Sequence, residues 1–175
     1  MTARSQDETR QASLEWFQRA ISCVSKAVIS RGQAIEGAPN FWTIDERYVP
    51  LRGRYRLEFS FHHTYTMRES SDGPRRWAVR SGSYFYQVRE RVGPEIIAFH
   101  WHPGRRGQPD FPHLHVTSQS GSVRIPAKSH VPTGRVSVES VIRFLIEELH
   151  VRPLRPDWDR VLLGGERVFN DRRSW

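Results

Sequence analysis

Two pairs of histidines lie close together in the sequence. His100 and His102 form the first pair and His113 and His115 the second, with one residue between the members of each pair. Because side chains alternate along a β-strand, each pair would project from one face of its strand. A hairpin through residues 103–112 would then bring all four imidazoles together. These four residues are the candidate site.

Three kinds of chemistry fit four neighbouring imidazoles. In the first, His113 and His115 form an acid–base pair and His100 or His102 assists, without a metal or other cofactor. In the second, the same four side chains bind zinc or another divalent transition metal. In the third, they only hydrogen-bond across the sheet. We place the acid–base hypothesis first.

The charge of the chain indicates an anionic partner. Lysine and arginine number 27 against 19 acidic residues, which gives a net charge of +8 and a pI near 10.5. Almost all of these cations are arginine, whose planar guanidinium binds phosphate through two hydrogen bonds. Nucleic acid or an acidic protein is therefore the expected partner. An RNA 2′-hydroxyl that attacks its own phosphate needs a base, an acid and a cation, and histidine and arginine supply all three.

Further residues are predicted to contact the substrate. Three arginines are expected to hold phosphate, and two tyrosines on one strand face are expected to position phosphate or stack on bases. These residues are Arg105, Arg106, Arg135, Tyr84 and Tyr86. Aromatic packing on a sheet is the alternative for the two tyrosines.

The apolar pattern predicts a helix, then a sheet, then helices. Apolar residues recur at three- and four-residue steps over residues 8–31, which is typical of an amphipathic helix. Residues 137–164 repeat this spacing in a helix over 138–150 that Ser137 caps, and a short helix over 157–163 follows, ended by two glycines. The tail, residues 165–175, is charged. Cys23 is expected to be a small core residue.

Residues 54–126 predict an antiparallel meander. The stretch 54–67 alternates between apolar and polar side chains, as a half-buried strand does. Turn residues separate it from the further strands expected at 76–91, 95–102 and 112–118, and a short fifth strand is expected at 123–125. Residues 37–50 are expected to be a connector. The fold class is therefore α+β, a single domain over residues 1–175, with four or five strands packed against an N-terminal and a C-terminal helix.

Length and composition predict a location. A chain of 175 residues is long enough to bury a core. No apolar run approaches the ~20 residues of a membrane helix, and the first residues lack the apolar core of a signal peptide. A single cysteine forms no internal disulfide, so we expect a cytoplasmic protein without membrane contact.

Residues 54–150 resemble a known family. The shared motifs are Tyr84-x-Tyr86, a strand that contains Trp101, and Pro112-His113-Leu114-His115 before an amphipathic helix. This arrangement is similar to the TumE-type toxins of bacterial and archaeal toxin–antitoxin pairs and their uncharacterised relatives. The chain departs from the family where His102-Pro103 follows the tryptophan in place of Asp-Asn. The resemblance implies a small basic toxin, a cognate antitoxin encoded next to it, and an RNA-related target.

The expected function is therefore that of a toxin-like protein that acts on RNA, as a metal-independent ribonuclease that uses paired histidines. Two alternatives stay open. One is a non-catalytic basic module that binds an acidic partner protein. The other is a cupin-like enzyme in which histidines hold a metal and act on a small molecule.

Overall fold

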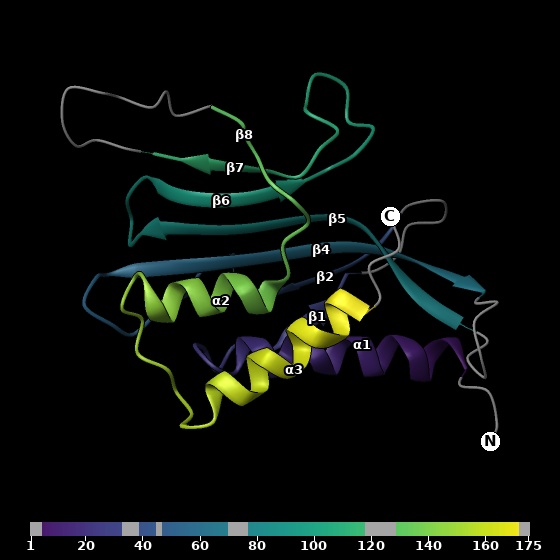
Figure 1. Cartoon of the computed structure of the whole chain (residues 1–175), viewed down its shortest axis with the longest axis horizontal. Helices are drawn as coiled ribbons and strands as arrows, with labels where there is room; N and C mark the ends of the chain where they lie inside the picture. Colours follow the sequence, from purple (N-terminus) through teal and green to yellow (C-terminus); the bar gives the residue numbers. More distant parts are fainter. Residues whose placement is uncertain (1–4, 33–38, 45–46, 70–76, 118–128, 172–175) are drawn as a thin grey trace.

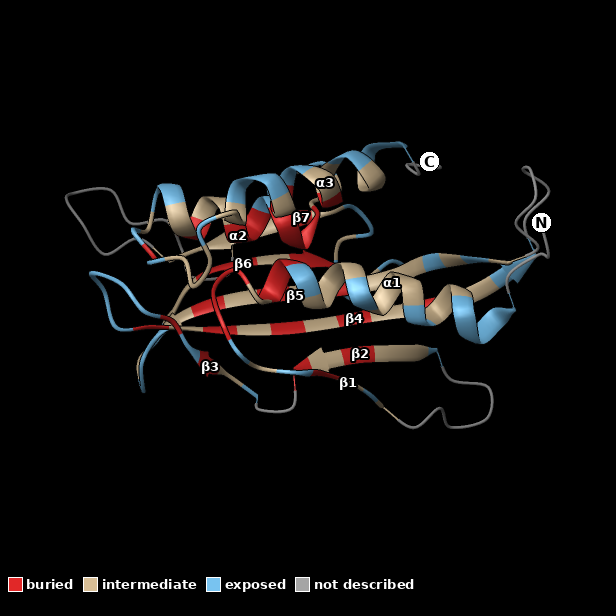
Figure 2. Ribbon diagram, turned by 90° about the horizontal axis from the view of Figure 1, so that it is seen from below, coloured by how far each residue is buried: buried red, intermediate tan, exposed pale blue. Residues whose placement is uncertain are grey.

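The computed structural model describes residues 5–32, 39–44, 47–69, 77–117 and 129–171. One N-terminal helix precedes an open antiparallel sheet, and two helices follow it. The three helices gather on one side of the sheet (Figures 1 and 2). The α+β class is confirmed, but within the described residues the sheet has eight strands rather than four or five.

The strands are joined mainly to their neighbours in sequence. The order across the sheet is β1-β2-β4-β5-β6-β7-β8, and β3 pairs with β4. Their bounds are β1 Ile29–Arg31, β2 Asn40–Ile44, β3 Val49–Pro50, β4 Leu57–Glu69, β5 Trp77–Glu90, β6 Glu95–Trp101, β7 His113–Val116 and β8 Val131–Pro132. The strand expected at 123–125 lies outside the described residues.

The two faces of the sheet differ in what covers them. Phe61 pairs with Tyr86, and His63 with Tyr84, so these side chains share a face. The ring of Phe17, on α1 (Gln6–Ile21), lies 5.5 Å from Phe61 and 4.9 Å from His63, so this face is the one that the helices cover. The opposite face of the sheet carries the side chains that alternate with these.

The first helix is shorter than its apolar spacing predicts. It ends at Ile21 rather than at residue 31, and residues 29–31 form β1 instead. The side chain of Gln18 explains the change of direction, because its amide nitrogen donates to Ala27 O at 2.9 Å and its oxygen accepts from Ile29 N at 2.8 Å. The side-chain amide of Gln18 thus forms the same pair of hydrogen bonds with residues 27 and 29 that a neighbouring strand would form. Cys23 is buried in the core, as expected.

The connector expected at 37–50 is not a simple loop. It contains β2 and β3, and Trp42 of β2 is fully buried against Tyr65, with 3.9 Å between the ring centroids. Aromatic and β-branched residues from Phe41 to Ile44 favour a strand, and this local preference outweighs the turn residues around it.

The third helix continues through the glycines that were expected to end it. It runs over Trp158–Asp171, so most of the predicted tail is helical. A Cβ atom on Gly165 would lie 2.4 Å from the Glu139 carboxylate of α2 (Val138–Glu147), so this glycine lets the two helices approach closely. Ser137 caps α2 as predicted. No helix within the described residues is long and apolar enough to cross a membrane.

The apolar face of α2 is expected to carry much of the stability. Leu145 is fully buried in the core, so Leu145→Ala should lower the free energy of unfolding by about 2–5 kcal/mol. Denaturant titration measures this loss. Leu163→Ala is the matched control, because Leu163 is exposed on α3 and its truncation should cost well under 1 kcal/mol. Equal losses at the two positions would contradict the assigned buried face.

Candidate metal centre

Five histidines meet on the face of the sheet that the helices do not cover. His100 on β6 pairs directly with His113 on β7, and their ring centroids are 5.5 Å apart. The rings of His102 and His115 lie 5.1 Å from that of His113. The convergence expected from the two His-x-His pairs is therefore confirmed. His130, just before β8, adds a fifth ring, 4.8 Å from that of His113.

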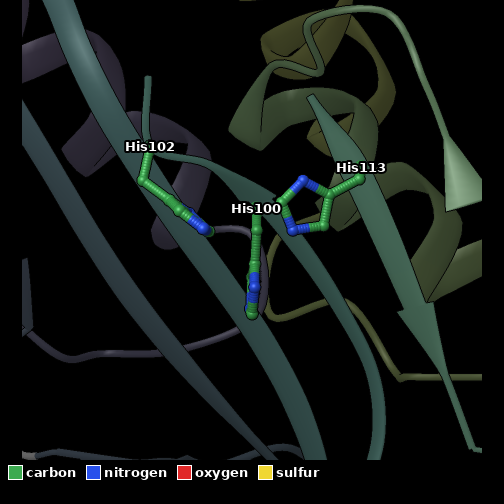
Figure 3. A group of neighbouring side chains, drawn as sticks. All are labelled: His100, His102 and His113. Atoms are coloured by element: carbon green, nitrogen blue, oxygen red, sulfur yellow. The ribbon is translucent and has the colours of Figure 1, made fainter. Parts of the chain in front are cut away.

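The five residues form two overlapping groups of three. In each group, one nitrogen from every residue lies within 4.8 Å of the others. The groups are His100, His102 and His113, and His113, His115 and His130. Figure 3 shows the first group, with His102 and His113 on either side of His100. His113 belongs to both groups and is fully buried, so it is the centre of the cluster.

Several ring nitrogens in the cluster are buried without a hydrogen-bond partner. Among the residues that the structure describes, the Nε2 atoms of His100, His113 and His115 have none. Leaving a buried polar atom unsatisfied costs about 1–3 kcal/mol, so three such atoms on three adjacent residues need a physical explanation. An ion bound in either group of three would supply the missing partner to His113 and to one of the other two.

Hydrogen bonds orient the central ring. His113 Nδ1 lies 2.9 Å from the carbonyl oxygen of Phe111. A carbonyl only accepts, so Nδ1 carries a proton, and Nε2 is the nitrogen that is left to bind a metal ion. Such an outer hydrogen bond on the second nitrogen is the usual arrangement for a histidine that binds a metal.

A chain of side chains stands behind His115. The Glu95 carboxylate lies 3.8 Å from His115 Nδ1. Gln87 donates to the other oxygen of Glu95, and Tyr48 donates to Gln87. The Arg89 guanidinium lies 3.6 Å from the centre of the Tyr48 ring, which completes the support. This chain favours a proton on His115 Nδ1 and leaves Nε2 as the nitrogen that can bind a metal ion.

The environment keeps imidazoles of the cluster neutral. Burial, followed by the charges of neighbouring histidines, lowers the pKa of His100 to about 3. Burial and nearby His113 also lower the pKa of His102 and of His115, and Arg105 contributes at His102. Neutral imidazole is the form that binds metal ions. The same shifts make these three side chains poor proton donors at neutral pH.

Two predicted arginines border the cluster. Arg105 and Arg106 are exposed in the loop between His102 and His113. The loop is held by a hydrogen bond of 2.8 Å from Gly104 N to the Asp110 carboxylate. Gly104 has a φ of 74°, in the left-handed region that favours glycine. These guanidinium groups are therefore available to an anion that approaches the histidines.

The other three predicted substrate contacts lie elsewhere. Tyr84 and Tyr86 are buried on the face that the helices cover, so their rings pack in the core and are not accessible for stacking on bases. Tyr84 pairs with Trp101, which shares its face, and the Arg135 guanidinium lies 3.9 Å from the Trp101 ring. Arg135 therefore stands on the opposite side of β6 from the histidines.

Sequence reasoning missed His130. It lies 15 positions beyond His115 and belongs to neither His-x-His pair. Its approach depends on β8 pairing with β7, through Leu114↔Val131 and His113↔Pro132. A two-residue strand that contains proline has almost no sequence signature, so no local pattern marks His130 as part of the site.

The comparisons with known proteins add no assignment. No protein-family model, no curated protein and no solved structure matches this chain. The fold and the histidine cluster therefore define it as an α+β protein with a candidate metal centre. The resemblance to the TumE-type toxins stays a prediction.

Proposed function

We propose that the histidine cluster is a centre for one divalent transition-metal ion in an enzyme that hydrolyses phosphodiester bonds of RNA. The observation that carries this proposal is that each of the two groups of possible ligands contains His113 and one further histidine whose Nε2 is buried without a hydrogen-bond partner among the described residues. Hydrogen bonding across the sheet, the structural alternative, leaves these nitrogens unexplained.

The geometry favours one ion rather than two. Both groups of three need His113, and its Nδ1 donates to Phe111 O, so only Nε2 is left as a ligand atom. A neutral imidazole has a single lone pair. The two groups therefore describe alternative or overlapping positions for the same ion.

The donor set selects the kind of metal. Imidazole suits zinc, copper, iron and nickel, whereas magnesium and calcium prefer oxygen ligands. Three protein ligands and one open position are typical of catalytic zinc sites. A bound ion of this kind would supply Lewis-acid chemistry, because it polarises an oxygen of the substrate and makes water more acidic.

The charge of the chain supports an anionic substrate. Twenty-five of its residues are arginine, and Arg105 and Arg106 are exposed in the loop between His102 and His113. Their guanidinium groups would hold the phosphate and stabilise the charge that develops on it. The Glu95 carboxylate would keep His115 in the tautomer that presents Nε2.

A metal-independent ribonuclease is the second candidate. Its support is His102, which is partly exposed beside Arg105 and so lies within reach of a substrate. The lowered pKa of His102 suits a general base better than an acid. The cognate antitoxin and the cytoplasmic location depend on the family resemblance and on composition, and they stay predictions.

Metal analysis distinguishes the two candidates. We expect the purified chain to contain about one zinc or other transition-metal ion, measured by elemental analysis. Chelation should abolish RNA cleavage, and adding back the ion should restore it. A 100-fold excess of ion over its Kd should stabilise the fold by about 2.7 kcal/mol. Cleavage that survives complete chelation would favour the metal-independent candidate.

A further inference from the structure

Four arginines line a cavity away from the histidines. This cavity of about 350 Å³ lies where β4 begins and β5 ends, whereas His102 follows the far end of β6. We call it the arginine pocket. The side chains that matter below are those of Arg52, Arg56, Arg91, Arg152 and Tyr55.

Backbone hydrogen bonds fix the positions of these arginines. Arg152 N donates to Arg52 O at 2.6 Å, and Arg91 N donates to Arg56 O at 2.7 Å. A Cβ atom on Gly53 would lie 2.5 Å from His150 O, so the glycine permits this close approach of two chain segments. The backbones of the four arginines are therefore held side by side in two pairs, although these residues are exposed and lie outside the helices and strands.

The positive charge of the pocket is not matched by the protein. No acidic residue lines it, among the ranges that the structure describes. Arg91 Nε lies 3.9 Å from a Glu58 oxygen, and within those ranges the guanidinium groups of Arg52, Arg56 and Arg152 have no carboxylate partner. Like charges held close together attract an anion. Arginine matches phosphate in particular, through two parallel hydrogen bonds.

An exposed aromatic ring stands at the same place. Tyr55 is 47% exposed, although large aromatic side chains are usually more buried. The Arg54 guanidinium lies 5.6 Å from its ring centre. An exposed ring beside several arginines is the combination with which proteins stack a base and hold the adjoining phosphate.

We propose that the arginine pocket binds a nucleotide unit, with its phosphate on the arginines and its base on Tyr55. The unit is either a free nucleotide or one residue of a single-stranded RNA, because both present the same chemistry. This site is separate from the proposed metal centre and does not depend on it.

The test is a binding titration on the full chain. The probes are inorganic phosphate, adenosine monophosphate and a fluorescent single-stranded RNA of eight adenosines. We expect Arg52→Gln/Arg152→Gln to weaken binding of the preferred nucleotide probe at least tenfold. If the RNA is that probe, the slope of log Kd against log salt should fall by about 0.7 for each phosphate that the variant no longer neutralises. Tyr55→Ala should weaken nucleotide and RNA binding but leave phosphate binding unchanged, and Tyr55→Phe should restore both.

Two controls keep the result specific. Arg167→Gln removes one positive charge from an exposed position on α3 and should bind the probes as the unchanged protein does. His113→Ala should also keep this binding, which separates the pocket from the metal centre. Arg56→Gln/Arg91→Gln is a second variant in case the first misfolds, as a thermal melt would reveal. Equal losses in Arg167→Gln, or no loss in either double variant, would overturn the proposal, and an inert Tyr55→Ala would overturn the nucleotide assignment.

Discussion

Replacing His113 with alanine should lower the metal affinity of the chain by more than about 100-fold. Loss of an outer-shell partner alone typically costs 10–100-fold, and His113 is common to both groups of possible ligands. RNA cleavage should fall with the metal content. Competition with a zinc-binding dye measures the affinity, and gel analysis of a labelled RNA measures the cleavage.

Control variants at histidines outside the two groups distinguish the loss of a metal ligand from the loss of any histidine. His62→Ala removes an imidazole on β4, and His150→Ala removes one that lies three residues after the end of α2. Both histidines lie outside the two groups, so both variants should keep the metal. Comparing His102→Ala with His130→Ala shows which group holds the ion. Unchanged affinity in both His113→Ala and His100→Ala would refute the metal centre.

Mild acid should remove the stabilising contribution of one buried histidine, His63. Its two ring nitrogens lie 3.0 Å from Tyr86 Oη and from Ser81 Oγ, in a buried setting away from the cluster. Burial, with a smaller contribution from His62, lowers the pKa of His63 to about 3, against 6.5 for an unperturbed histidine. Below pH 6.5 the unfolded state therefore binds more protons, and stability falls as the pH falls.

The expected magnitude follows from the size of this shift. Between pH 6.5 and 4.5 the contribution of His63 falls by about 3 kcal/mol, since each pH unit is worth about 1.4 kcal/mol. Glu139 acts in the opposite direction, because burial raises its pKa to about 7 and its ionisation destabilises the fold as the pH rises from about 4.5 to 7. Denaturant titrations at pH 7.5 and 4.5 measure the difference.

Two substitutions assign the titrating groups. His63→Gln should flatten the acid-side loss by about 3 kcal/mol, and Glu139→Gln should make the loss steeper by a similar amount. Each glutamine preserves hydrogen-bonding capacity without a charge that titrates in this range. A loss between pH 7.5 and 4.5 that is the same in His63→Gln as in the unchanged chain would show that His63 does not contribute.

The sequence predicts the centre of the fold better than its borders. The alternation from Leu57 to Tyr65 has a period of two, and a strand buried on one face leaves no other interpretation. Ser137 and the apolar spacing behind it locate α2 in the same way. The end of α1 differs from its prediction because a contact of the Gln18 side chain with residues 27 and 29 decides it, and periodicity carries no information about such a contact.

In the candidate site too, the sequence predicts what local spacing determines and misses what depends on distant segments. The two His-x-His pairs are recognisable because spacing along a strand determines the face of each side chain. His130 and the arginine pocket are not, since each depends on segments that come together only in the folded chain. Tyr84 and Tyr86 illustrate the opposite error, because alternation shows that two residues share a face but not which face is covered.

A contact between two segments that lie far apart in the sequence has a consequence for the synthesis of the chain. Leu154 N donates to Cys23 O at 2.8 Å, and Arg155 donates to Ser22 Oγ, 133 positions away. At about 5–20 residues per second, a ribosome needs roughly 7–27 seconds to add that length of chain. Throughout that interval the apolar side of α1 lacks the contacts that α2 and α3 make with it in the folded chain. We therefore expect the nascent chain to expose the apolar side of α1 until α2 and α3 have been synthesised, and a product truncated before them to be prone to aggregate.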